Sequence, residues 1–432
     1  MNQNVYDIAD YPQALEDIGA VINGIIADIK SRQQGESRPG AVILIPSGDY
    51  PLRTPVLIDI SYLKIQGCGH GFTSSSIRFN TSEEALRDWH EKWPGGSRIL
   101  VELEECAAFT VRRSGDPRIS SVEFENFNID GLHFRGGDDP ENTYLNGLTG
   151  ILVDCENDSF RFTQMGLIYL EHGIVCRRSD AVTIHDNFIA ECGSCVELLD
   201  FGQVAKITDN LIGAGYRADS ILIQNYAGAL VANNNVFPRG KSSLRLSVCV
   251  RCGVTGNRFH SFYPGMLVMD SGCAEVLIAS NHFLRDHEPW PPMQRYDSGA
   301  DDTLGLIVIA GDDNSLLANH ISETIEPKYL KPENTRPVII RVKEGHGNRI
   351  SDNHIVATAQ PSADQEDQAC YMAQIGALLS TGGIRPMPVI AVMIDSGSYG
   401  NIITDTCDAY EARLDRKVNR FRPLPAIESG TI

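Results

Sequence analysis

A stretch rich in carboxylates, TIHDNFIAECGSCVELLD at residues 183–200, is the first part of the chain with the residue types for chemistry. It contains four acids and a histidine: Asp186, Glu191, Glu197, Asp200 and His185. Hydrolysis of a glycosidic bond typically needs two carboxyl groups, one that protonates the leaving oxygen and one that acts as base or nucleophile. Asp186 and Glu197 are 11 residues apart, a spacing that would let them flank a corner between two short strands. Acids at this density also occur on solvated surface, and composition alone leaves both interpretations open.

Cysteine and glycine motifs point to structure rather than to a bound group. The pairs Cys192/Cys195 and Cys249/Cys252 are both CxxC motifs, but 53 residues lie between them. Paired motifs that bind zinc are usually within about 20 residues of each other. We therefore expect these cysteines to fill the core, with no metal and no cofactor. GCGHGF at 67–72 lacks the Lys-Ser/Thr pair of a phosphate-binding loop, so it favours a turn.

Two positions outside the acidic stretch are candidates for contact with a sugar. Trp290 lies among prolines in the polar segment RDHEPWPPMQRYDSGADD at 285–302 and could stack on a sugar ring. Arg239, in FPRG at 237–240, could donate hydrogen bonds to hydroxyl groups. A surface loop that buries its own tryptophan, and a structural turn around the arginine, account for these residues equally well.

The elements that would position these residues are indicated by a repeat in which Asn is followed two residues later by Ile or Phe. It occurs at Asn187, Asn210, Asn235, Asn257, Asn281, Asn319 and Asn353. The successive spacings are 23, 25, 22, 24, 38 and 34 residues, and the last two resemble the same period with inserted loops. Such a period is typical of a solenoid whose coils are sets of short strands. Asn tolerates a left-handed turn, and stacked amides form a ladder, while the Ile or Phe would point into the core.

The pattern therefore predicts an all-β fold, a single-stranded right-handed parallel β-helix with an N-terminal capping helix. Short β-branched runs such as SILIQ (220–224) and PVIIRV (337–342) have the character of its strands. Helical spacing over residues 13–31 places apolar side chains on one face, namely Leu15, Ile18, Val21, Ile22, Ile25 and Ile29. We expect an N-terminal segment and capping helix at 1–40, the catalytic β-helix at 41–407 with insertions near 285–302 and 322–336, and a C-terminal tail at 408–432.

The overall composition narrows the class of partner. The 432 residues carry a net charge of −19, which argues against nucleic acid and is compatible with a neutral sugar. No apolar run of about 18 residues is present, so no membrane span is predicted. The chain begins without the basic and apolar regions of a signal peptide, and its 11 cysteines show no disulfide framework. These features favour a cytoplasmic protein, or a secreted one if the chain is a trimmed mature form.

Several longer strings resemble one family, the inulin fructotransferases and the related difructose dianhydride III hydrolases. The resemblance runs over residues 5 to 360, through DIGAVINGIIADIKSR, PGAVILIPSGDY, YLKIQGCGHGF, GLIYLEHG, DNFIAECGSCVE, FPRG, FYPGM and IAGDDN. It implies β-helix homotrimers with active sites near the subunit interfaces. It also implies a catalytic Asp–Glu pair, which falls on Asp186 and Glu197. We expect Glu197 to be the general acid and Asp186 to assist it, with Glu171, His172 and Arg239 recognising sugar hydroxyls.

The resemblance leaves two reactions open on one linkage. The hydrolases open the cyclic dianhydride to inulobiose, and the transferases release it from inulin by using a sugar hydroxyl as acceptor. The lack of a signal peptide favours the hydrolase, which acts on a small imported sugar. Two other classes are weaker. A pectate-lyase-like enzyme would need a basic cluster beside a calcium site, and a non-catalytic β-helix adhesin would carry separate attachment domains.

Overall fold

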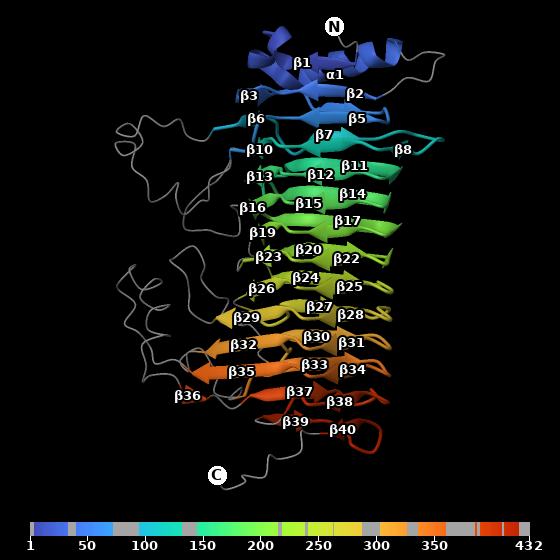
Figure 1. The fold of residues 1–432 in the computed structure, drawn as a ribbon, viewed down its shortest axis with the longest axis vertical. Helices are drawn as coiled ribbons and strands as arrows, with labels where there is room; N and C mark the ends of the chain where they lie inside the picture. Colours follow the sequence, from blue (N-terminus) through green and yellow to red (C-terminus); the bar gives the residue numbers. More distant parts are fainter. Residues whose placement is uncertain are drawn as a thin grey trace, which may run out of the picture. The chain divides into compact units, whose positions relative to one another are not determined.

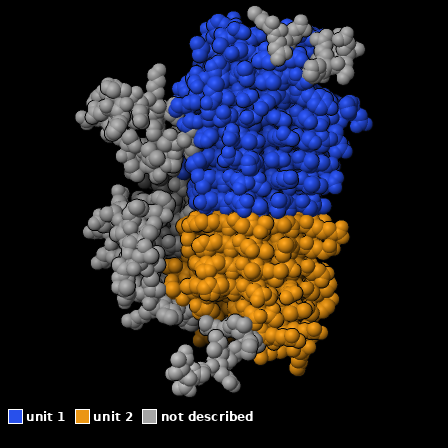
Figure 2. All heavy atoms as spheres, viewed as in Figure 1, with its two compact units in different colours: residues 1–240 blue, residues 241–432 orange. Residues whose placement is uncertain are grey.

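The computed structural model describes most of the chain as short strands arranged in successive coils (Figure 1). It describes residues 4–32, 40–71, 95–131, 145–214, 218–237, 241–261, 263–286, 303–325, 336–359, 385–386, 389–407 and 410–422. The chain divides into two compact units, Met1–Gly240 and Lys241–Ile432, which are coloured separately in Figure 2.

The first unit contains three sheets of parallel strands, here called A, B and C. Sheet A has the order β1 (Val5–Asp7), β2 (Ala41–Leu44), β5 (Leu63–Gln66), β9 (Glu123–Glu125), β12 (Arg161–Thr163), β15 (Thr183–His185), β18 (Lys206–Thr208) and β22 (Leu230–Ala232). Sheet B has β3 (Gly48–Leu52), β6 (Ser97–Val101), β10 (Asn128–Asp130), β13 (Gly166–Ile168), β16 (Phe188–Cys192), β19 (Leu211–Ala214) and β23 (Asn235–Val236). Sheet C has β4 (Val56–Ile58), β7 (Ala107–Val111), β11 (Thr149–Asp158), β14 (His172–Asp180), β17 (Ser194–Gln203) and β20 (Asp219–Gln224), with β8 (Ile119–Ser120) beside β11 and β21 (Tyr226–Ala227) beside β17. The chain visits A, B and C in turn, so each coil adds one strand to every sheet.

The second unit repeats this plan in sheets D, E and F. Sheet D has β25 (Gly253–Thr255), β28 (Leu277–Ala279), β31 (Ser315–Leu317), β34 (Arg349–Ser351), β38 (Ile402–Thr404) and β40 (Arg420–Arg422). Sheet E has β26 (Arg258–Ser261), β29 (His282–Asp286), β32 (His320–Ile325), β35 (His354–Ala359) and the antiparallel β36 (Arg385–Pro386). Sheet F has β24 (Ser242–Ser247), β27 (Leu267–Met269), β30 (Ile307–Ala310), β33 (Val338–Glu344), β37 (Ile390–Ile394) and β39 (Glu411–Arg413). Strands β39 and β40 extend the coils into the segment expected as a tail, just as β1 extends them into the N-terminal segment.

The predicted asparagine ladder is present in both units, with one residue corrected. In the first unit the Nδ2 of Asn187 donates to Asn210 Oδ1 at 2.9 Å, and Asn210 Nδ2 donates to Asn234 Oδ1 at 2.9 Å. The sequence assignment of Asn235 to the ladder was wrong, because Asn235 lies exposed on β23 while Asn234 is 1% exposed. The run NNVF contains two asparagines, and Val236 rather than Phe237 is the residue that fills the core.

The second unit has the same ladder and a further one that the repeat analysis missed. Amide-to-amide hydrogen bonds of 2.9–3.0 Å link Asn257, Asn281, Asn319 and Asn353. Another series joins Asn314, Asn348, Asn401 and Asn419 by bonds of 2.9–3.0 Å at the turn that leads into sheet D. Because each amide both donates and accepts, each ladder holds successive coils in a fixed register.

The interior is filled by apolar side chains stacked coil upon coil. Cys176 lies in register between Val153 and Leu198, and all three are fully buried. The rings of Phe124 and Phe162 stack at 5.5 Å. The four cysteines of the two CxxC motifs are each at most 2% exposed, which confirms that they pack in the core. In the described part of the chain, no group of three or more His, Cys, Asp or Glu side chains is arranged to hold a metal ion.

Helix α1 (Ala14–Arg32) packs against β3 and β4 and covers the N-terminal end of the first unit, as predicted (Figure 1). Its buried face contains Ile18, Ile22, Ile25, Ile26 and Ile29. Leu15, expected on this face, is 65% exposed, because the backbone at Asp17 is non-helical and changes the phase of the first turn. The Asp17 carboxylate instead accepts hydrogen bonds from Thr54, 2.6 Å to its hydroxyl. Among the described helical residues, none forms a helix long and apolar enough to cross a membrane.

Candidate active site

The corner between sheets B and C in the middle of the first unit positions a cluster of charged side chains. There the Ser194 amide donates to the Glu171 carbonyl at 2.7 Å, which ties the coil of β17 to that of β14. A Cβ on Gly173 would lie 2.5 Å from the Cys195 carbonyl oxygen, and one on Gly193 would lie 2.5 Å from that of Glu171. The glycines of the strings LEHG and AECG thus allow the two coils to approach closely.

Strand β17 presents Glu197 on the outer face of sheet C. Its neighbours Val196 and Leu198 are fully buried in the core, and alternation turns Glu197 away from them. In register, Glu197 lies between Val175 on β14 and Leu222 on β20. It is only 8% exposed despite facing outward. Its surroundings are therefore partly apolar, which strengthens its interaction with any nearby charge.

His172 and Glu171 converge on this carboxylate. The Nδ1 of His172 lies 2.5 Å from Glu197 Oε2, and its Nε2 lies 3.8 Å from Glu171 Oε1. Glu171 is itself fixed, because its Oε2 accepts from the Gly147 amide at 2.7 Å and its amide donates to Asn146 Oδ1 at 3.1 Å. The imidazole ring is therefore held between two carboxylates.

The electrostatics of this cluster favour a charged imidazole. The hydrogen bond to Glu197 raises the pKa of His172, and the charges of Glu197 and Glu171 add to this. Burial and the nearby Arg177 oppose the shift, without reversing it. The net shift therefore favours the protonated form of the imidazole that contacts Glu197.

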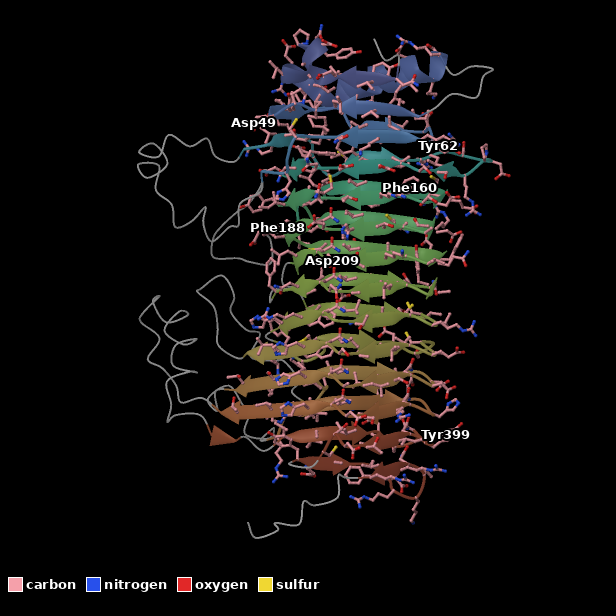
Figure 3. The ribbon with its side chains drawn as sticks, in the orientation of Figure 1. Asp49, Tyr62, Phe160, Phe188, Asp209 and Tyr399 are labelled. Carbon is pink, nitrogen blue, oxygen red and sulfur yellow. The ribbon has the colours of Figure 1, made fainter. Side chains whose placement is uncertain are left out.

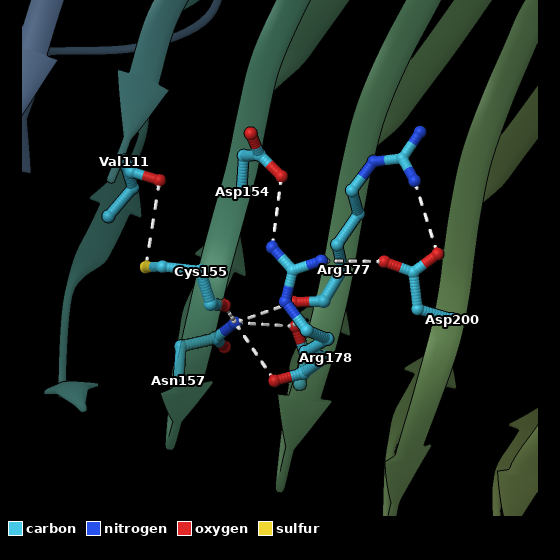
Figure 4. Close-up of polar contacts among 8 residues, drawn as sticks. Val111, Asp154, Cys155, Asn157, Arg177, Arg178 and Asp200 are labelled. Atoms are coloured by element: carbon cyan, nitrogen blue, oxygen red, sulfur yellow. Dashed lines mark hydrogen bonds and ion pairs between the residues drawn. The ribbon is translucent and has the colours of Figure 1, made fainter. Parts of the chain in front are cut away.

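An arginine network lies further along the same two strands (Figure 4). Arg177 and Arg178 each donate to Asp200, at 3.2 and 2.9 Å, and Arg178 also donates to Asp154 at 3.0 Å. The pairing of β14 with its neighbours shifts register here, and the buried Asn157 amide donates to the Arg177 carbonyl at 3.0 Å. The shift directs two adjacent guanidinium groups to one carboxylate. The string RRSD was the sequence signal for the two arginines of this network, and no role was predicted for it.

Asp186 lies at a different corner from Glu197, in the turn between sheets A and B. It has φ 54°, is exposed, and its Oδ2 accepts from Gln164 Nε2 at 3.2 Å. Its charge also acts on His70, where it opposes the lowering of the pKa that burial causes. The five residues of β16 lie between Asp186 and the B–C corner, and an extended strand of this length spans roughly 16 Å. Within one chain, Asp186 therefore precedes β16 at the A–B corner, whereas Glu197 lies on β17 beyond the B–C corner. The two acids do not flank one corner, contrary to the expectation from their spacing.

The remaining acids of the stretch have other surroundings. Glu191 is 2% exposed, and Asp200 belongs to the arginine network. His185 faces the next coil, where Asp209 Oδ2 lies 3.4 Å from its Nδ1. Figure 3 marks Phe188 and Asp209 near these turns. Arg239 and Trp290 lie outside the described residues.

Comparison with known proteins identifies the family. A family model for the β-helix repeat of inulin fructotransferase matches residues 280–425, and one for the right-handed β-helix region matches residues 107–288, in agreement with the predicted handedness. The chain is 40% identical over 368 residues to the DFA-I-forming inulin fructotransferase of Arthrobacter globiformis, covering 83% of this chain and 90% of that protein. This chain belongs to the inulin fructotransferase family. The resemblance found in its sequence is thereby confirmed.

Solved structures place this family member beside the DFA-IIIases. The DFA-IIIase of Arthrobacter chlorophenolicus A6 in complex with DFA-III is 51% identical, with a TM-score of 0.91 over 99% of this chain and 100% of that one. The same enzyme in complex with GF2 is 52% identical, with a TM-score of 0.90 over 98% of this chain and 100% of that one. Both the fold and the enzyme class of the family agree with the sequence analysis.

Proposed function

We propose that this chain is a difructose dianhydride III hydrolase, which opens the cyclic disaccharide to inulobiose. The observation that carries the proposal is the likeness to DFA-IIIase, which extends over 98–99% of this chain at 51–52% identity. The likeness to the DFA-I-forming fructotransferase is weaker, at 40% identity over 83% of this chain. An inulin fructotransferase is the second candidate, because its reaction uses the same linkage. The net charge of −19 suits a neutral fructose-containing oligosaccharide.

We further propose that Asp186 and Glu197 supply the two carboxyl groups of the reaction, and that they come from different subunits. A glycosidase places its two carboxyl groups within about 10 Å of each other, around one bond. In a single chain the five residues of β16 keep them further apart. A homotrimer with sites near the subunit interfaces would bring Asp186 of one copy to Glu197 of the next.

The contacts to the sugar remain predictions. Glu171 and the arginine network offer charged groups on the outer face of sheet C. Arg239 and Trp290 are proposed to bind a hydroxyl and to stack on a ring. We also place the protein in the cytoplasm, in keeping with the free thiols of the ten described cysteines.

Product analysis tests the reaction. The purified protein is incubated separately with difructose dianhydride III and with inulin, and the products are separated by chromatography. We expect inulobiose from the dianhydride and no cyclic product from inulin. A cyclic dianhydride released from inulin would establish the transferase instead, and no turnover of either sugar would refute both.

Variants test the two acids and their placement. Asp186→Asn and Glu197→Gln should each lower kcat by about 10² or more while leaving the fold intact. Asp209→Asn is the matched control, because Asp209 occupies the same left-handed turn one coil later, with φ 59° against 54°. When equal amounts of Asp186→Asn and Glu197→Gln chains are expressed together, one site in three of each mixed trimer, which is about one in four of all sites, should regain both acids and activity. An inactive mixture would show that each chain must provide both acids itself.

A further inference from the structure

The role of His172 can be inferred from the groups on either side of its ring. Its Nδ1 faces Glu197 at 2.5 Å, and its other nitrogen faces Glu171 at 3.8 Å. A residue that recognises sugar hydroxyls needs a free ring nitrogen directed at the substrate. Here the shortest contact of the ring is with the carboxylate of Glu197, on the neighbouring coil.

The surroundings of Glu197 explain why such a partner is needed. The carboxylate is 8% exposed and lies between Val175 and Leu222, and a charge in an apolar setting is costly unless it is paired. A short charge-assisted hydrogen bond offsets this cost and fixes one oxygen of the carboxylate. The other oxygen then has a defined direction.

We propose that Glu171 and His172 form a positioning relay that keeps Glu197 ionised and oriented for the fructosyl centre. The inference rests on the proposed function of the site and adds the state in which Glu197 works. Glu171, anchored by Gly147 and Asn146, orients the ring, and His172 carries the proton that Glu197 would otherwise hold. Glu197 then serves as a charged carboxylate and not as the resting proton donor. This assignment differs from the general-acid role that the sequence analysis gave it.

The charges facing His172 set the direction of the pH dependence. Glu197 on β17 and Glu171 beside the ring favour the imidazolium, and Arg177 on β14 disfavours it. Loss of the imidazolium would remove the positive charge that lies 2.5 Å from Glu197 Oε2. Opposite charges at this distance typically change a carboxyl pKa by about 1–3 units.

The first test uses the pH dependence of activity. In His172→Gln the acid limb of the kcat profile should move to higher pH by about 1 unit or more, with kcat lowered about tenfold or more and KM little changed. His185→Gln is the matched control, because His185 lies on the neighbouring sheet A and faces Asp209 instead. A raised KM with an unmoved acid limb in His172→Gln would mean that His172 only binds a hydroxyl, and would overturn the relay.

The second test needs no substrate. Histidine labelled with ¹³C in the full-length protein allows His172 to be titrated by NMR, with His172→Gln used to assign its signal. Glu197→Gln should lower the pKa of His172, and Glu171→Gln should lower it less. An unchanged titration in Glu197→Gln would refute the relay even in an active enzyme. A coupled titration in a protein that cleaves neither sugar would refute the proposed reaction and leave the pairing established.

Discussion

Replacing Asn234 by alanine tests the ladder that sets the register of the coils. Its Oδ1 accepts from the amide and from the side chain of Asn210, at 3.0 and 2.9 Å, and its Nδ2 donates to the Ile207 carbonyl at 2.9 Å. Each hydrogen bond contributes about 1 kcal/mol net, and a buried group left without a partner costs about 1–3 kcal/mol. Because Asn234 is 1% exposed, water cannot replace the lost contacts without opening the turn. We expect Asn234→Ala to lower the free energy of unfolding by about 3–5 kcal/mol.

The neighbouring residue supplies a matched control for this experiment. Asn235 has the same side chain but lies exposed on β23, and its backbone bond to the Asn210 carbonyl survives in alanine. Asn235→Ala should therefore cost less than about 1 kcal/mol. Urea unfolding followed by circular dichroism compares the two variants directly. Equal losses, or a larger loss in Asn235→Ala, would show that the amide ladder does not pass through Asn234.

Three other perturbations test the packing and the electrostatics of the coils. Arg285 and Glu323 pair at 2.7 Å, and both side chains are fully buried. Glu323→Gln should therefore lower the free energy of unfolding in urea by about 3–5 kcal/mol, and a loss below about 1 kcal/mol would contradict a buried charge pair. Burial lowers the pKa of His260 to about 3, so the unfolded chain binds more protons than the folded one below neutral pH. The free energy of unfolding should therefore fall by roughly 2 kcal/mol from pH 8 to pH 5, and this fall should be smaller in His260→Gln. Gly173→Ala would place a methyl group 2.5 Å from the Cys195 carbonyl oxygen and should lower activity by displacing β14 from β17. Normal activity would show that the two coils can separate without affecting the site.

The fold was predictable because its ladder repeats in the sequence with the period of a coil. The spacings become more regular once Asn234 replaces Asn235. The motif alone could not show which of these two adjacent asparagines belongs to the ladder. Asn348 and Asn401 also precede Ile by two residues, so the second ladder was visible in the same motif. The helix was predicted within one residue at each end, and its phase failed at Leu15 because the non-helical backbone at Asp17 leaves no trace in apolar spacing.

The candidate site was harder to predict, because distance along the chain and distance in space follow different rules in a solenoid. Asp186 and Glu197 are only 11 positions apart in sequence, yet the chain between them crosses the whole of β16. His172 and Glu197 are 25 residues apart, which is about one coil, and they are in contact. The period that predicted the ladder therefore also contained the contact between His172 and Glu197, whereas the pair Asp186 and Glu197 was chosen within a single coil.

The same rule governs the other charge pairs of sheet C, which explains why register is decisive for the site. Arg177 meets Asp200 across 23 residues, and Arg178 meets Asp154 across 24. Each pair joins neighbouring coils, so one residue inserted into or deleted from either coil would turn alternate side chains to the opposite face of the sheet. Glu197 would then face the core, where Val196 and Leu198 now lie, and His172 would lose its partner. The asparagine ladder is thus a condition for the chemistry as well as for the fold. It fixes which side chain of each coil meets which side chain of the next.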